Sequence, residues 1–321
     1  SGLSSDSDGN TIGGTNAGDS ITTGTNNTVI GKDAGTAITT GSSNVAIGKD
    51  SLKLNTTASN NTAVGEQCLE DNTTGTNNTA VGRIALNANT TGSQNTAVGA
   101  NALDANTTAD NCTAFGFNSL TASNAGSNSA FGAYTLTSTT TGGDNTALGR
   151  GGLSDNSTGA ANTAVGYNSL TSNTTASNNT AVGHDCLKLN TTGAQNTAVG
   201  KDALASNTTA AYNVAIGYRA LQANTTGTQN TAVGSFALED ITTASYCTAI
   251  GYNGLRNNAA ANNTACGYAG LQDNTTGSNN TAVGYYSLVT NTTGTSNTAV
   301  GSQALEANTT ADNNTGIGYK A

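Results

Sequence analysis

The apolar and polar positions of this chain follow one pattern from end to end. A segment of the form Asn-Thr-Ala-Val-Gly-x-x-Ala-Leu-x-x-Asn-Thr-Thr-Gly-x-Asn returns nineteen times, in steps of seventeen residues except for two steps of sixteen. Its places are called repeat positions 1 to 17, and the glycine at repeat position 5 recurs from Gly14 to Gly318. A short, fixed period predicts a solenoid, in which each repeat forms one turn that contacts only its neighbours.

Repeat positions 1 to 5 predict a short strand. Alternation along a strand places repeat positions 2 and 4 on one face and repeat position 3 on the other. Repeat position 4 is apolar from Ile30 to Ile317, and repeat position 2 becomes valine at Val45 and Val214. We therefore expect repeat positions 2 and 4 to face the core, together with the leucine at repeat position 9. The predicted core residues are Val64, Leu69, Val81, Leu86, Val165 and Leu170.

Each turn is predicted to hold this strand, a corner at the glycine, a second extended piece with the leucine, and a polar Asn-Thr-Thr turn. Stacked turns of this kind predict an all-β, parallel β-solenoid of about 19 turns, with side-chain amide ladders between the repeated asparagines. At about 4.8 Å per turn the stack would be a rod of roughly 90 Å. We expect residues 1–9 to form an N-terminal lead-in and residues 10–321 to form one continuous array.

The alanine at repeat position 3 is unbroken over sixteen repeats, from Ala46 to Ala299. On the alternation above it points away from the core, and an outward strand position in water should vary. The constant alanine therefore predicts close packing against a second copy of the chain, although a turn that requires a small residue would give the same pattern. The predicted subunit interface comprises Ala63, Ala80, Ala97, Ala114, Ala164, Ala181, Ala198 and Ala232.

Composition narrows the function classes. The absence of proline and the 41 glycines suit a structure in which every backbone N–H is needed for a ladder. A net charge of -9, without a basic stripe, argues against nucleic acids and anionic membranes as partners. No apolar run approaches the roughly 20 residues that span a bilayer, so we expect no membrane insertion.

Residues capable of chemistry are scattered. The five cysteines occupy different repeat positions without a Cys-x-x-Cys motif, which indicates small buried residues rather than disulfides or a zinc site. His184 stands beside Asp185 without a recurring nucleophile, so we expect no enzyme, cofactor or metal. The run from Asp6 to Asn10 is a partial calcium-loop pattern that lacks the final glutamate, and an Asp-Gly turn explains it more simply.

Repeat position 6 varies and becomes rich in tyrosine in the second half of the chain. Tyrosines one turn apart could stack on the rings of cell-surface sugars, or they could simply cover the glycine corner of the next turn. The candidate ligand-binding residues are Tyr167, Tyr218, Tyr252, Tyr268, Tyr285 and Tyr319.

Two repeats carry a family resemblance. The segments from Asn44 to Gly48 and from Asn213 to Gly217 read Asn-Val-Ala-Ile-Gly, which resembles the head repeats of trimeric autotransporter adhesins. The longer form with Ala-Leu and Asn-Thr-Thr-Gly is similar to repeat arrays of bacteriophage tail fibres and bacterial surface proteins. The resemblance implies a left-handed β-roll, a homotrimer and an extracellular role in attachment, on a cell surface or a virion.

Three functions are therefore carried forward. The first is a structural and adhesive fibre shaft. The second is a self-assembling extracellular filament, because Leu3 resembles the leucine that would follow the final Ala321 at repeat position 8, so the ends could stack in register. A piece cut from a longer array would have ends of the same kind, and this explanation is preferred. The third is an ice-binding solenoid, suggested by the regular threonine rank at Thr57, Thr74, Thr91 and Thr108.

Overall fold

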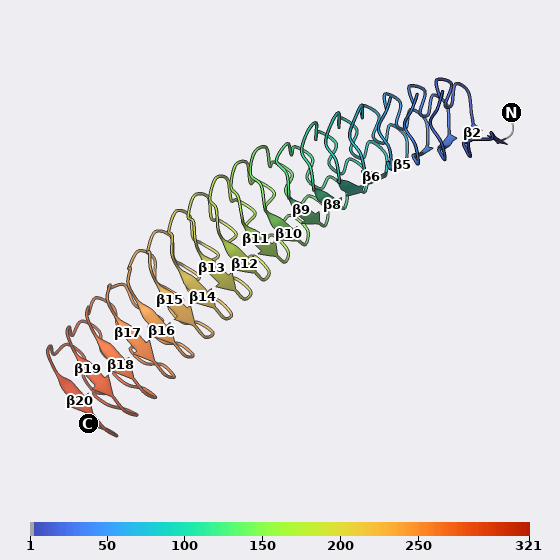
Figure 1. The fold of residues 1–321 in the computed structure, drawn as a ribbon. Helices are drawn as coiled ribbons and strands as arrows, with labels where there is room; N and C mark the ends of the chain where they lie inside the picture. The colour runs from blue at the N-terminus through green and yellow to red at the C-terminus, as the bar shows by residue number, and fades with distance from the viewer. Residues whose placement is uncertain (1–2) are drawn as a thin grey trace. The chain divides into compact units, whose positions relative to one another are not determined.

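The computed structural model describes residues 3–321, and over this range the chain is an all-β, parallel β-solenoid without a helix (Figure 1). Nineteen repeat strands, one per repeat, delimit about 18 turns of about 17 residues each. The predicted fold class is confirmed. Residues 1 and 2 of the expected lead-in lie outside the described range.

The chain divides into two compact units, Ser1–Ala161 and Asn162–Ala321. Whether residues 10–321 form one continuous array stays a prediction. The first unit contains β1 (Ser4–Ser5), β2 (Thr11–Gly13), β3 (Thr28–Ile30), β4 (Val45–Ile47), β5 (Thr62–Val64), β6 (Thr79–Val81), β7 (Thr96–Val98), β8 (Thr113–Phe115), β9 (Ser129–Phe131) and β10 (Thr146–Leu148). The second contains β11 (Thr163–Val165), β12 (Thr180–Val182), β13 (Thr197–Val199), β14 (Val214–Ile216), β15 (Thr231–Val233), β16 (Thr248–Ile250), β17 (Thr264–Cys266), β18 (Thr281–Val283), β19 (Thr298–Val300) and β20 (Thr315–Ile317).

Within each unit, successive repeat strands pair in parallel and in register. Ala63 lies beside Ala80 in the first unit, and Ala181 lies beside Ala198 in the second. Because every repeat position meets the same position of the next turn, each kind of side chain forms a column along its unit. Only β1 departs from this arrangement, since it pairs antiparallel with β2.

The glycine at repeat position 5 makes the corner after each strand. At Gly200 the φ angle is +134°, a region that L-residues with side chains avoid. A Cβ atom there would lie 2.5 Å from the carbonyl oxygen of Gly217 in the next turn. The corner therefore needs glycine both for its backbone angle and for the close approach of the next turn.

The core is arranged differently from the prediction. The leucines at repeat position 9 are buried as expected, including Leu69, Leu86 and Leu170. The valines at repeat position 4 instead face outward: Val64 and Val165 are half-buried, and Val81 is exposed. The predicted strand orientation was therefore wrong, and the inward positions of the strand are repeat positions 1 and 3.

Repeat position 3 is consequently part of each turn's own core and is not available as a subunit interface. The physical reason is the distance between the strand and the leucine. In the turn where Gly35 replaces the leucine, repeat position 3 carries Val29, and a Cβ atom added at Gly35 would lie 3.1 Å from Val29 Cγ1. A leucine at repeat position 9 therefore leaves room only for a smaller residue at repeat position 3. The interface prediction is wrong for all eight alanines, which are fully buried: Ala63, Ala80, Ala97, Ala114, Ala164, Ala181, Ala198 and Ala232.

Buried asparagines form the predicted amide ladders at repeat position 12. Asn72 Nδ2 donates to Asn55 Oδ1 at 2.9 Å, and Asn89 Nδ2 donates to Asn72 Oδ1 at 2.8 Å. In the second unit Asn207 Nδ2 donates to Asn190 Oδ1 at 2.8 Å. These bonds run from turn to turn, so they add side-chain connections to those of the backbone.

A second asparagine column, at repeat position 1, joins backbone to side chain. Asn44 Oδ1 accepts the backbone N–H of Asn61 at 3.0 Å, and Asn61 Nδ2 donates to the carbonyl oxygen of Gly75 at 2.9 Å. Both asparagine columns are buried in the interior of the turns. A buried polar group is tolerated when it is hydrogen-bonded, which explains how so polar a chain forms a core.

Candidate functional site

Side chains vary most at one corner of the turns, formed by repeat positions 6, 7 and 10 and called the variable corner below. In the second unit this corner carries a run of aromatic rings. Tyr252 stacks on Tyr268 with ring centroids 5.2 Å apart and an interplanar angle of 18°, and Tyr268 stacks on Tyr285 at 5.5 Å and 26°. The rings thus pack against one another along the column, so part of each ring face is occupied by a neighbouring tyrosine.

The run continues through two aromatic residues at repeat position 7, beside the candidate tyrosines of repeat position 6. Phe236, at repeat position 7, makes edge contacts with both Tyr218 and Tyr252, at 5.3 and 5.7 Å. Tyr286 makes edge contacts with Tyr268 and Tyr285. Shielding from water and the neighbouring phenols Tyr286 and Tyr252 raise the pKa of Tyr268 above its usual value.

The six predicted tyrosines are therefore only partly brought together. Tyr218, Tyr252, Tyr268 and Tyr285 belong to the connected run, and all four are exposed. Tyr167 stacks on His184 at 5.2 Å. Tyr319 lies beneath the ammonium group of Lys320, at 5.4 Å from the ring centroid.

Charged side chains also gather at the variable corner. In the second unit the nearly buried carboxylate of Glu239 contacts Arg256 Nη2 at 2.7 Å and Arg219 Nη1 at 3.6 Å. Arg219 lies over the ring of Tyr218, and Arg256 lies over the ring of Phe236. The signal that would have located this group is the spacing of the three charges at repeat positions 7 and 10 of nearby turns.

The first unit has an ionic version of the same corner. Lys49 and Lys53 each approach Asp50 at 3.1 Å, and Lys53 also approaches Glu70 at 3.6 Å in the next turn. Asp50 is partly shielded from water, which opposes ionisation, but the two lysines outweigh this effect and lower its pKa. The lysine partners are exposed to water, and pairs with an exposed partner typically contribute about 0–1 kcal/mol each, so they mainly set the charge pattern of the corner.

One group of three side chains in the described part of the chain has donor atoms close enough to share a metal ion. The donors of His184, Asp185 and Asp202 lie within 4.8 Å of one another. Asp185 already contacts His184 Nδ1 at 3.4 Å and the ammonium group of Lys188 at 3.5 Å, so the lysine already balances its charge. The expected absence of metals, cofactors and catalysis stays a prediction.

Four of the five cysteines are buried, as the sequence predicts for small residues inside the turns. Cys68, Cys112, Cys186 and Cys247 are buried free thiols, and burial raises the pKa of Cys68 and Cys186 to about 12. Cys266 lies at the outward repeat position 4 and is only half-buried, which corrects its expected place in the core.

Asp6 begins a turn that contains the Asp8-Gly9 pair, as the simpler interpretation of the partial calcium motif predicts, and the Gly9 N–H donates to the carbonyl oxygen of Asp6 at 3.4 Å. Its Oδ1 accepts the backbone N–H groups of Asp8 and Asn10, and its Oδ2 accepts Asn10 Nδ2. The hydrogen bonds from the side chain and backbone of Asn10 hold the pKa of Asp6 below its usual value.

A different surface is formed by the outward residues of the repeat strands, at repeat positions 2 and 4, and is called the sheet face below. Repeat position 2 is threonine in sixteen of nineteen repeats, and repeat position 4 is apolar in every repeat after the first. Neither column contains a charged residue. Ile47, Ile216 and Ile250 are 37%, 40% and 44% exposed, so this uncharged surface includes large apolar side chains in contact with water.

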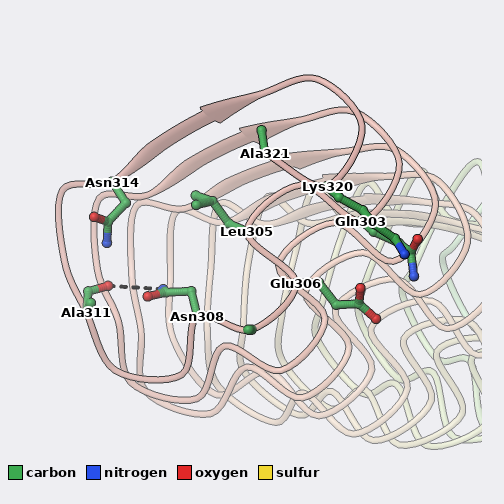
Figure 2. A pocket seen from close by; sticks show the side chains of 9 residues that line it. Gln303, Leu305, Glu306, Asn308, Ala311, Asn314, Lys320 and Ala321 are labelled. Atoms are coloured by element: carbon green, nitrogen blue, oxygen red, sulfur yellow. Dashed lines mark hydrogen bonds between the residues drawn. The ribbon is translucent and has the colours of Figure 1, made fainter.

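A pocket of about 500 Å³ lies at the last turn (Figure 2). Figure 2 shows Leu305, Asn308 and Asn314 inside the outline of that turn, and Asn308 Nδ2 donates to the carbonyl oxygen of Ala311 at 3.1 Å. The equivalent residues of earlier turns are covered by the next turn. The pocket is therefore the uncovered interior of the last described turn.

No protein-family model matches the sequence, and no curated protein is significantly similar to it. The chain is a β-solenoid repeat protein with repeats of about 17 residues. None of the described residues belongs to a helix of the length and hydropathy required to cross a bilayer.

Proposed function

We propose that this chain is the shaft of a structural and adhesive fibre on a cell surface or a virion, and that copies of it associate with one another. The observation that carries the proposal is the hydrogen bonding between successive turns in the interior. Backbone bonds between turns are accompanied by asparagine columns that also bond from turn to turn, as at Asn72 and Asn89. Such an interior gives a stiff support whose outer corner is free to vary.

The adhesive part of the proposal rests on the variable corner. Its residues change from the ionic group around Asp50 to the aromatic run around Tyr268, while the interior stays constant. Marked variation at an exposed corner is expected of a surface that contacts other molecules. Cell-surface carbohydrate is one proposed ligand, through the exposed edges and hydroxyl groups of the tyrosines.

Immunogold electron microscopy of the source cells or particles, with antibodies raised against the purified chain, tests the location. A fibre shaft predicts label on projections outside the cell or on the virion. Label confined to the cell interior would contradict the proposal. Pre-immune serum on the same sections is the matched control.

A deletion of residues 197–230 tests the shaft itself. It removes two whole repeats and rejoins Asn196 to Thr231 in the original register. We expect the particle to shorten by about 10 Å in electron micrographs, because two turns occupy that length, with little change in thermal stability. The control deletes residues 197–222, which is not a whole number of repeats, and should unfold the region around the junction.

The other functions stay separate proposals. End-to-end filament assembly predicts particles whose length grows with protein concentration. Ice binding predicts thermal hysteresis and faceted ice crystals. Each would be measured on the same purified sample.

A further inference from the structure

The two columns of the sheet face have different chemistry although they lie on the same strands. Strands favour β-branched residues in general, so β-propensity would allow threonine in either column. Threonine or serine fills repeat position 2 in seventeen of nineteen repeats, yet neither occurs at repeat position 4. The apolar choice at repeat position 4 therefore needs a cause beyond strand formation, and its side chains are not in the core of their own chain.

Contact with water does not explain why the exposed repeat position 4 is always apolar. Val199, Ile216 and Ile250 in the second unit are 36%, 40% and 44% exposed. An apolar stripe that recurs on successive strands is a feature of surfaces that another molecule covers. We propose that the sheet face of this chain pairs with the sheet face of a second copy. The proposal deepens the self-association in the proposed function and rests on it.

A second copy fits this surface for three reasons. Its side-chain columns repeat with the same spacing along the stack, so contacts made at one strand can recur at the next. The face carries no charge, so two copies of a chain with net charge -9 can meet there without placing like charges in contact. Aligned packing of two sheets is also a common arrangement, with the inner side chains of both sheets interdigitating.

The number of sheet faces on each chain decides whether copies of the chain form a dimer or a trimer. Each repeat contains one strand in the described structure, so each unit offers one sheet face. One self-complementary face closes as a pair with two-fold symmetry, whereas a ring of three needs two different surfaces on every chain. The sheet face therefore favours a dimer over the trimer implied by the adhesin resemblance.

The area of the sheet face in one unit lies at the lower limit of what pairing requires. The second unit has ten strands of three residues each, β11 to β20, and two residues of each strand face outward. With strands about 4.8 Å apart and three residues of about 3.3 Å each, its face covers about 480 Å², or about 960 Å² in total on two copies. This is close to the roughly 1,000 Å² that a specific interface requires, and the first unit has a face of the same kind.

A crystalline surface such as ice fits less well. The apolar column keeps its hydrophobicity but not its shape, since it includes Val98, Phe115 and Leu148 in the first unit. The rings of Phe115 and Phe131 stack at 5.5 Å and 9°, which places two bulky groups side by side on the face. A protein partner can accommodate such a bulge by packing around it, whereas a flat lattice cannot.

The test compares two triple variants by sedimentation velocity and light scattering. The sheet-face variant carries Val199→Glu, Ile216→Glu and Ile250→Glu. The control carries Thr192→Glu, Thr209→Glu and Thr243→Glu, which add the same charge at exposed turn positions seven residues before each site. Circular dichroism spectra of both variants should match the wild type, because all six side chains are at least partly exposed.

We expect the wild type and the control to have twice the chain mass of 31.5 kDa, and the sheet-face variant to have the single chain mass, a twofold decrease. A wild-type monomer or trimer would overturn the pairing, as would a sheet-face variant that keeps the wild-type mass. If the wild type is monomeric and shows thermal hysteresis, and the sheet-face variant loses that hysteresis, the sheet face binds ice instead. Because label location and particle length are measured separately, the shaft proposal can stand if pairing fails.

Discussion

Asn89 offers the sharpest test of how the turns are held together. It is fully buried at repeat position 12. Its Nδ2 donates to Asn72 Oδ1 at 2.8 Å and to the carbonyl oxygen of Gly92 at 2.9 Å, and its Oδ1 accepts from Asn106 Nδ2 at 2.9 Å. Asn89→Ala removes all three hydrogen bonds from the interior of the first unit.

The cost can be worked out from these partners. Three hydrogen bonds at about 1 kcal/mol each give about 3 kcal/mol. The carbonyl oxygen of Gly92 keeps a second donor, Asn78 Nδ2, and Asn106 Nδ2 keeps the carbonyl oxygen of Ala109. Asn72 Oδ1 loses its donor, and an unsatisfied buried acceptor adds about 1–3 kcal/mol. We expect Asn89→Ala to destabilise the neighbouring turns by about 4–6 kcal/mol.

Native-state hydrogen exchange is the suitable assay, because turns of a repeat array open locally and each amide reports its own opening free energy. Amides of the turns around Asn72 and Asn106 should lose protection, and urea unfolding should begin at lower concentration. The control is Asn77→Gly: Asn77 is exposed with a φ angle of +59°, which glycine also adopts, so we expect a change within about 0.5 kcal/mol. Equal protection in the two variants would refute the role assigned to the ladder.

Three further predictions concern the corner, the interior and the thiols. Gly200→Ala should destabilise the chain by about 3 kcal/mol or more, because it combines a strained φ angle with a Cβ placed against the next turn; an unchanged urea midpoint would contradict this. Ala181→Leu should cost about 1–3 kcal/mol by overpacking, measured in the same way, and should lower stability whatever the oligomeric state. In the sheet-face variant, iodoacetamide at pH 8 should label Cys266 while Cys68 and Cys186, with pKa values near 12, stay unlabelled until urea unfolds the chain; mass spectrometry of the peptides would reveal early labelling of either buried thiol.

The sequence was sufficient for the fold because one period controls every element. The glycine at repeat position 5, the leucine at repeat position 9 and the repeated asparagines each form a column, and the structure confirms the solenoid and the amide ladder. Period alone, however, does not say which strand face is inside. The prediction placed Val64 in the core because it is apolar, and placed Ala63 outside because it never varies.

The structure reverses both assignments, since Ala63 faces the core and Val64 faces outward. The alanine is constant because the leucine fills the space beside it. Where Gly35 replaces the leucine, the larger Val29 replaces the alanine and extends into that space. The asparagine at repeat position 1 is in phase with repeat position 3, and its regular recurrence was the available signal for the inward face. The tyrosine column was predictable from repeat position 6. The edge contacts that Phe236 and Tyr286 make with it depend on side-chain orientations at repeat position 7, which the repeat pattern does not specify.

The two sixteen-residue repeats have a consequence for how such a gene can change. Despite the missing residue, Ala114 still pairs with Ala130 and Ala249 still pairs with Ala265, so the lost length is absorbed outside the strands. Small insertions and deletions should accumulate in the polar turn and be eliminated from the strand and its glycine corner. Because adjacent turns are chemically equivalent, recombination between misaligned repeats can remove or add whole turns without creating a new kind of contact. Related chains are then expected to differ in length by multiples of one repeat.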